Sequence, residues 1–188
     1  LSGVRDSLDK PTDYWKTNVI GTQRLFEHYR DTRILYASSS TAHEPWKNPY
    51  AMSKYSMEQL NHNNSVGMRF TTVYGPGARK HMLIPKILRN DVQYINVNHI
   101  RDFIHVNDIV SAVQVIMNVT FRGVIDVGTG VSNKLVDIAD YFKIDYKSVI
   151  GGETERIDNT ADTSILNKFG WRAKTNLYEY IEQNKVVN

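Results

Sequence analysis

The run YAMSK at positions 50–54 places a phenol and an ammonium four residues apart. Pro49 precedes it and suits the first turn of a helix, on which positions i and i+4 share a face. An ammonium beside a phenol favours the phenolate, so we expect Lys54 to lower the pKa of Tyr50. A base, a cation and a hydroxyl from a neighbouring strand are the groups needed to oxidise an alcohol. The alternative is an exposed helix with a solvated lysine, because so short a motif also arises by chance.

The segment from Ser38 to Thr41 can supply that hydroxyl, because it follows an apolar run that predicts a buried strand. Apolar patterns typical of strands and of helices alternate along the rest of the chain. Strands are expected at 33–37, 65–73, 92–97, 101–106 and 123–127, and helices at about 12–29, from 50 to 61–64, and at 82–88, 109–117, 135–141 and 177–181. This alternation predicts an α/β fold with a parallel sheet.

Composition narrows the class of protein. The 188 residues are 41% hydrophobic and 23% charged, which is ordinary for one globular domain. Because there is no cysteine, thiol chemistry and thiolate metal sites are excluded, and a cytoplasmic location is expected. Six histidines show no metal-ligand spacing, so we predict no metal. The net charge of +3 is scattered and no apolar run would span a membrane, so neither a nucleic acid nor a membrane is expected as a partner.

Several short motifs occur in an order that is found in one enzyme family. They are GVRDS at 3–7, NVIGT at 18–22, YASSS at 36–40, YAMSK at 50–54, RFTTVYGP at 69–76, RDFIHVNDI at 101–109, GTG at 128–130 and GW at 170–171. By these motifs the chain resembles the extended short-chain dehydrogenases/reductases. Within that group it resembles the NAD-dependent nucleotide-sugar epimerases and dehydratases, and most of all the UDP-glucuronate 4-epimerases.

The resemblance implies a fold and a reaction. The fold is a Rossmann-like parallel sheet with a smaller C-terminal α/β lobe that binds the substrate. The reaction is epimerisation at C4 of a UDP-sugar, UDP-glucuronate to UDP-galacturonate, through a 4-keto sugar with NAD as hydride carrier. In the matching positions Tyr50 is the base on the 4-hydroxyl, Lys54 holds the nicotinamide ribose, and Ser39 hydrogen-bonds the reacting oxygen. Tyr50 and Lys54, with Phe70 and Val73, would contact the cofactor.

The resemblance also assigns the groups that bind the substrate's negative charges. Thr72 and Arg79 match positions that hold the sugar carboxylate, and a guanidinium suits a carboxylate because it offers paired donors. Arg101 matches the arginine that meets the nucleotide diphosphate, and Arg156 is expected to be a second such arginine. For each arginine the alternative is a surface or structural ion pair.

Ser40 and Thr41 are expected beside the reacting sugar, and this segment separates related reactions. The sugar 4,6-dehydratases place an Asp-Glu pair just after the hydroxyl residue, whereas here no carboxylate occurs before Glu44. This difference favours an epimerase, with a dehydratase or reductase acting on another nucleotide sugar as the alternative. Asn18 is expected either to hydrogen-bond beneath the site or to be solvated on its helix.

The sequence lacks the Gly-rich strand-turn-helix that the family uses for the cofactor pyrophosphate. We therefore expect the first strands of the Rossmann sheet to be absent, which makes the chain a fragment or, as a rival hypothesis, a non-catalytic module that binds sugar nucleotides. Residues 1–78 are interpreted as the remainder of the dinucleotide-binding domain. Residues 79–188 are interpreted mainly as the substrate lobe, with 101–130 returning to the sheet. A homodimer is a further hypothesis, because family members commonly pair through helices beside the active site.

Overall fold

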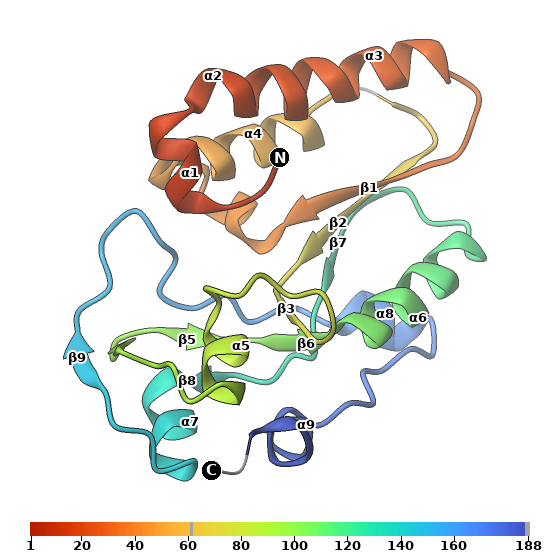
Figure 1. Cartoon of the computed structure of the whole chain (residues 1–188). Helices are drawn as coiled ribbons and strands as arrows, with labels where there is room; N and C mark the ends of the chain where they lie inside the picture. The colour runs from red at the N-terminus through yellow and green to blue at the C-terminus, as the bar shows by residue number, and fades with distance from the viewer. Residues whose placement is uncertain (61, 187–188) are drawn as a thin grey trace.

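A computed structural model describes residues 1–60 and 62–186 of the chain (Figure 1). The helical elements are α1 Val4–Asp9, α2 Pro11–Tyr14, the π-helix η1 Trp15–Ile20, α3 Gly21–His28, the 3₁₀ turns η2 Ser40–His43 and η3 Pro45–Lys47, α4 Pro49–Glu58, α5 Leu83–Leu88, α6 Val106–Met117, α7 Leu135–Tyr141, α8 Ser164–Lys168 and α9 Leu177–Asn184. The strands are β1 Ile34–Ser39, β2 Ser65–Phe70, β3 Thr72–Tyr74, β4 Tyr94–Asn96, β5 Ile100–Arg101, β6 Phe103–His105, β7 Gly123–Val127, β8 Asn133–Lys134 and β9 Lys147–Val149.

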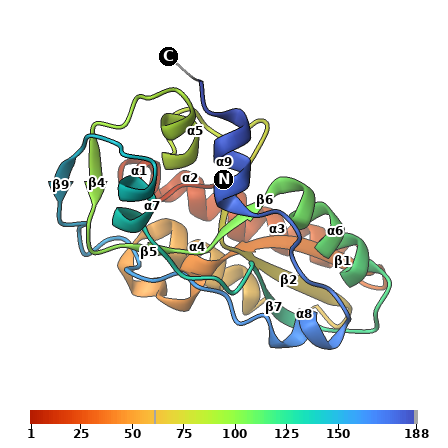
Figure 2. The same ribbon diagram turned by 90° about the horizontal axis from the view of Figure 1, so that it is seen from below.

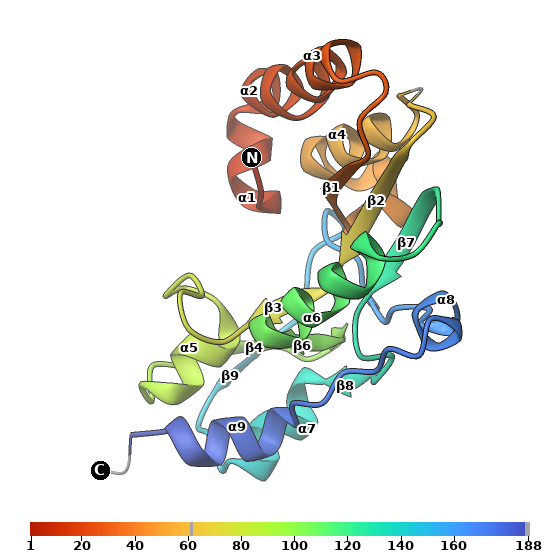
Figure 3. The same cartoon turned by 90° about the vertical axis from the view of Figure 1, so that its right-hand side faces the viewer.

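A three-stranded parallel sheet in the order β1-β2-β7 carries the first core. Helices α3 and α4 lie over one face of this sheet, and α6 and α8 lie over the other (Figures 1 and 3). Val66 and Ile125 of the sheet pack with Ile116 of α6 and Leu166 of α8, and all four are almost completely buried. Both faces are covered by helices, and the charged residue of β2, Arg69, is paired with Glu58 of α4. The predicted α/β fold with a parallel sheet is confirmed.

A second core lies beyond the carboxyl ends of β1 and β2 and is built from short elements (Figure 2). Its centre is formed by Ile84 of α5, Ile95 of β4, Ile138 of α7 and Ile181 of α9, each 2% exposed or less. The pairs β4–β9 and β3–β6 are parallel, and β5–β8 is antiparallel. Each of these strands has two or three residues, so β8 and β9 have no alternating pattern from which they could be predicted.

Two buried polar contacts explain why predicted continuous strands are interrupted. The strand expected at 65–73 breaks at Thr71, whose N–H donates to the carbonyl of Val127, and the chain then leaves the sheet as β3. The strand expected at 101–106 breaks at Asp102, which is fully buried and accepts hydrogen bonds from the N–H groups of Thr129 and Gly130. Buried polar groups need such partners, and here they decide where the strands end.

The helical run before the sheet extends over the predicted 12–29, but it contains an unpredicted π-helix. Asn18 lies in this π-helix, is 4% exposed, and donates from Nδ2 to the hydroxyl of Ser53 in α4 at 2.9 Å. The helix that was predicted to end near Asn61 ends at Glu58, and Asn61 itself lies outside the described residues. Over the described part of the chain, no helix combines the length and apolar character needed to cross a membrane.

Candidate active site

A cleft of about 650 Å³ opens at the carboxyl ends of β1 and β2, where the two cores meet. Its lining includes every residue that the sequence assigned to catalysis, cofactor or substrate: Ser39, Ser40, Thr41, Tyr50, Lys54, Phe70, Thr72, Val73, Arg79, Arg101 and Arg156. These residues are up to 117 positions apart in the sequence and come from both cores. The structure therefore brings the predicted residues together, while the role of each remains a prediction.

Helix α4 positions Tyr50 and Lys54 on one buried face. Its first residue is Pro49, as predicted, and the side chain of Asn48 accepts a hydrogen bond from the Ala51 N–H at 2.8 Å. This side chain is the N-cap, which satisfies one of the free N–H groups at the start of the helix. Tyr50 is 9% exposed and Lys54 is 7% exposed, so both reach the cleft from within the protein.

Tyr50 is held by an aromatic contact and has a raised pKa. Its ring packs edge-on against Tyr14, with 5.9 Å between ring centroids. Burial raises the pKa of Tyr50 because it penalises the phenolate, and a hydrogen bond with Ser39 and the charge of Arg79 oppose this effect. The prediction that Lys54 lowers this pKa is wrong for the protein without ligands. The cation that acts on the phenol is Arg79, and burial outweighs it.

Lys54 is a buried cation with spare hydrogen-bonding capacity. Its Nζ donates to the carbonyl of Ala37 on β1 at 2.7 Å and lies 5.9 Å from the centroid of the Tyr50 ring. Burial lowers the pKa of Lys54 to about 8, while Glu58 one turn further along α4 acts in the opposite direction. An ammonium carries three donors. Beyond the bond to Ala37, Nζ therefore has donors left for a ligand in the cleft, which fits the ribose hydroxyls of a nicotinamide cofactor.

Ser39 ends β1 and begins a cluster of hydroxyl groups. Its Oγ accepts hydrogen bonds from the N–H of Thr41 at 3.2 Å and from the hydroxyl of Thr41 at 2.9 Å. Since Thr41 donates to Oγ, the Ser39 proton is free to point toward a group in the cleft. Ser39 and Ser40 are 7% and 4% exposed, so the cluster is fixed rather than solvated.

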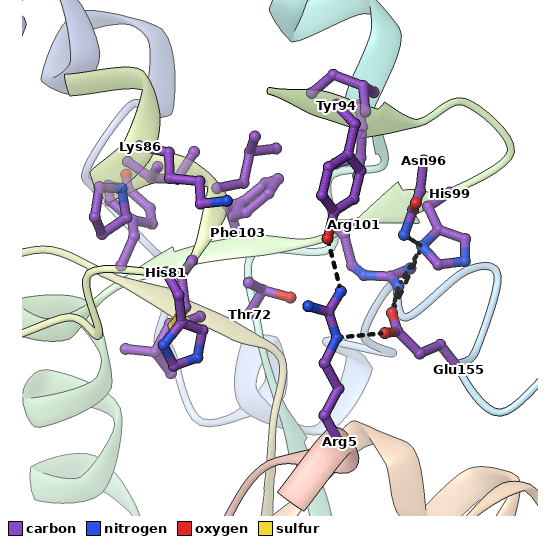
Figure 4. Close-up of a pocket in the computed structure, with 18 residues that line it drawn as sticks. Arg5, Thr72, His81, Lys86, Tyr94, Asn96, His99, Arg101, Phe103 and Glu155 are labelled. Carbon is purple, nitrogen blue, oxygen red and sulfur yellow. Dashed lines mark hydrogen bonds and ion pairs between the residues drawn. The ribbon is translucent and has the colours of Figure 1, made fainter. Parts of the chain in front are cut away.

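Arg101 lies in the wall between the cleft and an adjoining pocket of about 200 Å³ (Figure 4). One of its terminal nitrogens donates to His99 Nδ1 at 2.9 Å and to Glu155 Oε2 at 3.3 Å. Arg5 reaches the same place from α1, donating to the Tyr94 hydroxyl at 3.0 Å with its Nε 3.9 Å from Glu155 Oε1 (Figure 4). The other terminal nitrogen of Arg101 donates to the carbonyls of Ile100 and Ile157 at 2.8 and 2.9 Å. The two guanidinium groups therefore meet at the carboxylate of Glu155 in the cleft wall, and a diphosphate that bound there would compete with this carboxylate.

The other predicted substrate residues differ in how freely they face the cleft. Arg79 is exposed and makes one long contact, 3.4 Å, to the carbonyl of Ser2. The Thr72 hydroxyl accepts from Asn159 at 2.9 Å. Arg156 donates to the carbonyl of Ser40 at 2.6 Å and lies near Glu44, so its guanidinium, like that of Arg101, is directed largely at the protein.

Some residues of the site had no role in the sequence interpretation. Arg5 stood inside a quoted motif, and its basic character was the signal that could have identified it. Asn48, Glu155 and Asn159 lie in loops whose contacts depend on tertiary structure, so the sequence carries no sign of them. Within residues 1–60 and 62–186, no group of three His, Asp or Glu side chains is arranged to hold a metal ion.

The chain is similar to several known proteins in sequence and in structure. Protein CapI of Staphylococcus aureus is 32% identical over 142 residues, covering 60% of this chain and 42% of CapI, so the chain spans less than half the length of that relative. The structure of MoeE5 in complex with UDP-glucuronic acid and NAD matches with a TM-score of 0.82 and 28% identity, covering 97% of this chain and 74% of MoeE5. A UDP-glucuronic acid 4-epimerase from Bacillus cereus, 21% identical, shares the fold with a TM-score of 0.83, covering 98% of this chain and 71% of that one.

The family assignment follows from a match over most of the sequence. The model of the NAD dependent epimerase/dehydratase family aligns with residues 1–128, which include β1, α4, β2 and β7. The matched part contains the Ser39, Tyr50 and Lys54 cluster and the Arg101 wall of the cleft. The chain belongs to the NAD dependent epimerase/dehydratase family.

Proposed function

We propose that the chain carries the catalytic and substrate-binding part of an NAD-dependent nucleotide-sugar 4-epimerase that converts UDP-glucuronate to UDP-galacturonate. The observation that carries this proposal is one cleft with Ser39, Tyr50 and Lys54 at one end and the Arg5–Arg101 wall at the other. The first group suits a sugar hydroxyl and the second suits a diphosphate. MoeE5, which binds UDP-glucuronic acid and NAD, supports the same ligand pair.

The cleft residues beside Tyr50 fit the nicotinamide end of NAD. Lys54 offers donors to the nicotinamide ribose, and Phe70 and Val73 line the cleft beside Tyr50. When it is bound, NAD accepts a hydride from the sugar and returns it. The sequence has no G-x-G-x-x-G run, so these residues account for the nicotinamide ribose and not for the pyrophosphate.

Side chains of this protein carry out the proton transfers of the proposed reaction. The Tyr50 phenolate takes the proton of the sugar 4-hydroxyl as the C4 ketone forms, and the Ser39 hydroxyl donates to the same oxygen. The Ser39 hydroxyl and the charge of Arg79 favour the phenolate and oppose the burial that raises the pKa of Tyr50. After the 4-keto sugar has turned its other face, the Tyr50 hydroxyl returns the proton to the alkoxide oxygen. The 4-keto sugar is then the only intermediate between the substrate and its epimer, which distinguishes this reaction from a dehydration.

Product analysis tests the proposal. The chain is incubated with NAD and UDP-glucuronate, and the sugar nucleotides are separated by chromatography. Appearance of UDP-galacturonate supports the 4-epimerase. A product lacking the elements of water supports the dehydratase alternative. Binding of UDP-glucuronate with no conversion in the presence of bound NAD supports the non-catalytic binding module and contradicts the proposal.

Arg79 provides a test of the uronate as substrate. Arg79→Met is expected to weaken the binding of UDP-glucuronate about tenfold to hundredfold, because a charge-assisted hydrogen bond to the carboxylate is lost. UDP-glucose has no carboxylate, so its binding constant is expected to stay within about twofold. Lys80→Met at the neighbouring exposed position is the control. Equal losses for both sugar nucleotides would refute a carboxylate contact at Arg79.

A homodimer is proposed on the face formed by α1, η1, η3 and α4. Leu8, Trp15, Trp46 and Met52 line a shallow depression there and are 47%, 45%, 73% and 40% exposed. So many large apolar side chains in one patch are typical of an interface. Trp15→Glu is expected to convert a dimer to a monomer in light scattering, whereas Val110→Glu on α6, 52% exposed, is not. A wild-type chain that is monomeric at about 50 μM, a concentration at which specific interfaces of ordinary size are occupied, would exclude this dimer.

A further inference from the structure

The loop after β9 crosses from the second core to the catalytic elements, and its residues 153–156 are called the strap here. Figure 1 shows this loop in blue, rising from β9 toward α1 and α4. Arg156 in the strap donates to the carbonyl of Ser40 at 2.6 Å. Ser40 directly follows Ser39, the hydroxyl nearest to Tyr50 in the proposed reaction. The strap therefore holds the backbone that positions the hydroxyl cluster.

The strap also holds the start of the helix that carries Tyr50. Asn48 donates from Nδ2 to the carbonyl of Thr154 at 2.8 Å, while its Oδ1 caps α4 by accepting from the Ala51 N–H. One amide side chain thus joins the strap to the helix N-terminus. Lys47 adds a second hydrogen bond, which Nζ donates to the carbonyl of Glu155 at 3.2 Å.

One residue of the strap, Glu155, contacts the diphosphate end of the cleft. Glu155 has one carboxylate oxygen 3.3 Å from Arg101 and the other 3.9 Å from Arg5. Any anion that binds between these guanidinium groups must contact or move Glu155. The strap thus contacts residues at both ends of the cleft.

One unsatisfied pair of groups shows where a movement of the strap would add a contact. Arg156 Nε and Glu44 Oε2 are buried 3.7 Å apart, and neither has a hydrogen-bond partner among the described residues. A small movement of the strap would bring them into contact.

We propose that the strap couples occupancy of the nucleotide-diphosphate position to the alignment of Ser39 and Tyr50, and that Arg156 is a positioning residue in this coupling rather than a ligand of the diphosphate. The inference rests on the proposed function, because it takes a nucleotide diphosphate as the occupant. A diphosphate that engages Arg101 and Arg5 competes with the Glu155 carboxylate and moves the strap. The movement closes the 3.7 Å gap between Arg156 Nε and Glu44 Oε2 and so tightens the contact of the strap with the catalytic elements.

Hydrogen exchange of the backbone tests the coupling without requiring turnover. UDP is the probe, and its affinity is measured by calorimetry on each variant of the full chain. In the wild type, saturating UDP is expected to slow exchange in peptides covering 40–52 at least threefold. Arg156→Met is expected to bind UDP within threefold of wild type but to lose this protection, and Arg156→Lys is expected to retain most of it. Arg122→Met, at an exposed position before β7, is the charge-matched control.

The outcomes separate the coupling from the proposed function. A wild-type chain that does not bind UDP overturns both. UDP binding without slower exchange at 40–52, or equal protection in Arg156→Met, overturns the coupling alone. A loss of UDP affinity greater than tenfold in Arg156→Met shows a diphosphate ligand and overturns the positioning role. If Arg156→Met fails to fold, Asn48→Asp serves instead, because it keeps the cap acceptor and removes the donor to Thr154, and the same loss of protection is expected.

Discussion

Tyr50→Phe is expected to lower turnover of UDP-glucuronate at least about 1000-fold while leaving UDP binding within about twofold. The substitution removes the one oxygen that can take and return the C4 proton in the proposed reaction, and proton transfer by a positioned side chain contributes about 10²- to 10⁴-fold. Ser39 cannot replace it, because its Oγ already accepts two hydrogen bonds from Thr41. The diphosphate wall at Arg101 is untouched, so binding is retained.

The ring of Tyr50 has a structural role that phenylalanine keeps. It packs edge-on against Tyr14 at 5.9 Å, and that contact does not involve the hydroxyl. The free energy of unfolding is therefore expected to change by less than about 1 kcal/mol. A matched control is Tyr55→Phe, which removes the same oxygen from a 37% exposed position on the same helix and should not change turnover.

The assay uses added NAD and follows the sugar nucleotides by chromatography, with UDP affinity measured separately. Turnover in Tyr50→Phe above about a tenth of wild type would contradict the role of Tyr50 as the base, because acid–base catalysis contributes far more than tenfold. A parallel loss of UDP affinity would instead point to a binding role for the phenol.

How much of this site the sequence could predict depends on how local each feature is. Helix α4 was predictable because its signals, Pro49 and the spacing of Tyr50 and Lys54, lie within one turn. The strand before Ser39 was predictable because it is a short apolar run ended by hydroxyl residues. The residues of the cleft between Thr72 and Arg156 were predicted from the family resemblance alone. The structure brings them to the same cleft as Tyr50 and Lys54.

Features that arise from packing between distant segments could not be predicted. The direction of the Tyr50 pKa shift is set by burial, which a pair of residues four apart does not reveal. The contact of Arg156 with Ser40 joins positions 116 residues apart, and no pattern in either segment indicates it. The π-helix around Asn18 likewise reflects a partner, Ser53, that lies on another helix.

Lys54→Met is expected to lower turnover at least about 100-fold and, at the same time, to raise the free energy of unfolding at pH 7 by about 1 to 2 kcal/mol. Burial lowers the pKa of Lys54 to about 8 from its ordinary 10.5. One pKa unit corresponds to about 1.4 kcal/mol, so a buried charge here opposes folding by roughly 3 kcal/mol. The lost hydrogen bond to Ala37 offsets part of the gain. Methionine can fill the same space with an unbranched apolar side chain.

The pH dependence of this effect identifies its cause. Between pH 8 and 10.5 the unfolded wild type holds the Lys54 proton and the folded protein does not, so wild-type stability rises with pH across that window. Lys54→Met has no proton to lose at this position. The stability difference between the two proteins is therefore expected to be full below about pH 8 and to shrink toward pH 10.5. Urea unfolding at pH 7, 8.5 and 10 measures it, with Lys16→Met at an exposed helical position as the control.

A buried cation that destabilises the fold is expected to be retained for its role in binding or catalysis. The stability of Lys54→Met therefore bears on the function of Lys54. If Lys54→Met stabilises the protein and abolishes turnover, the ammonium has a catalytic role that opposes folding. Turnover that depends on the charged form of Lys54 should also fall above about pH 8 in the wild type. A variant that is less stable than wild type at pH 7 would show instead that the bond from Nζ to Ala37 outweighs burial of the charge, and that Lys54 holds β1 against α4.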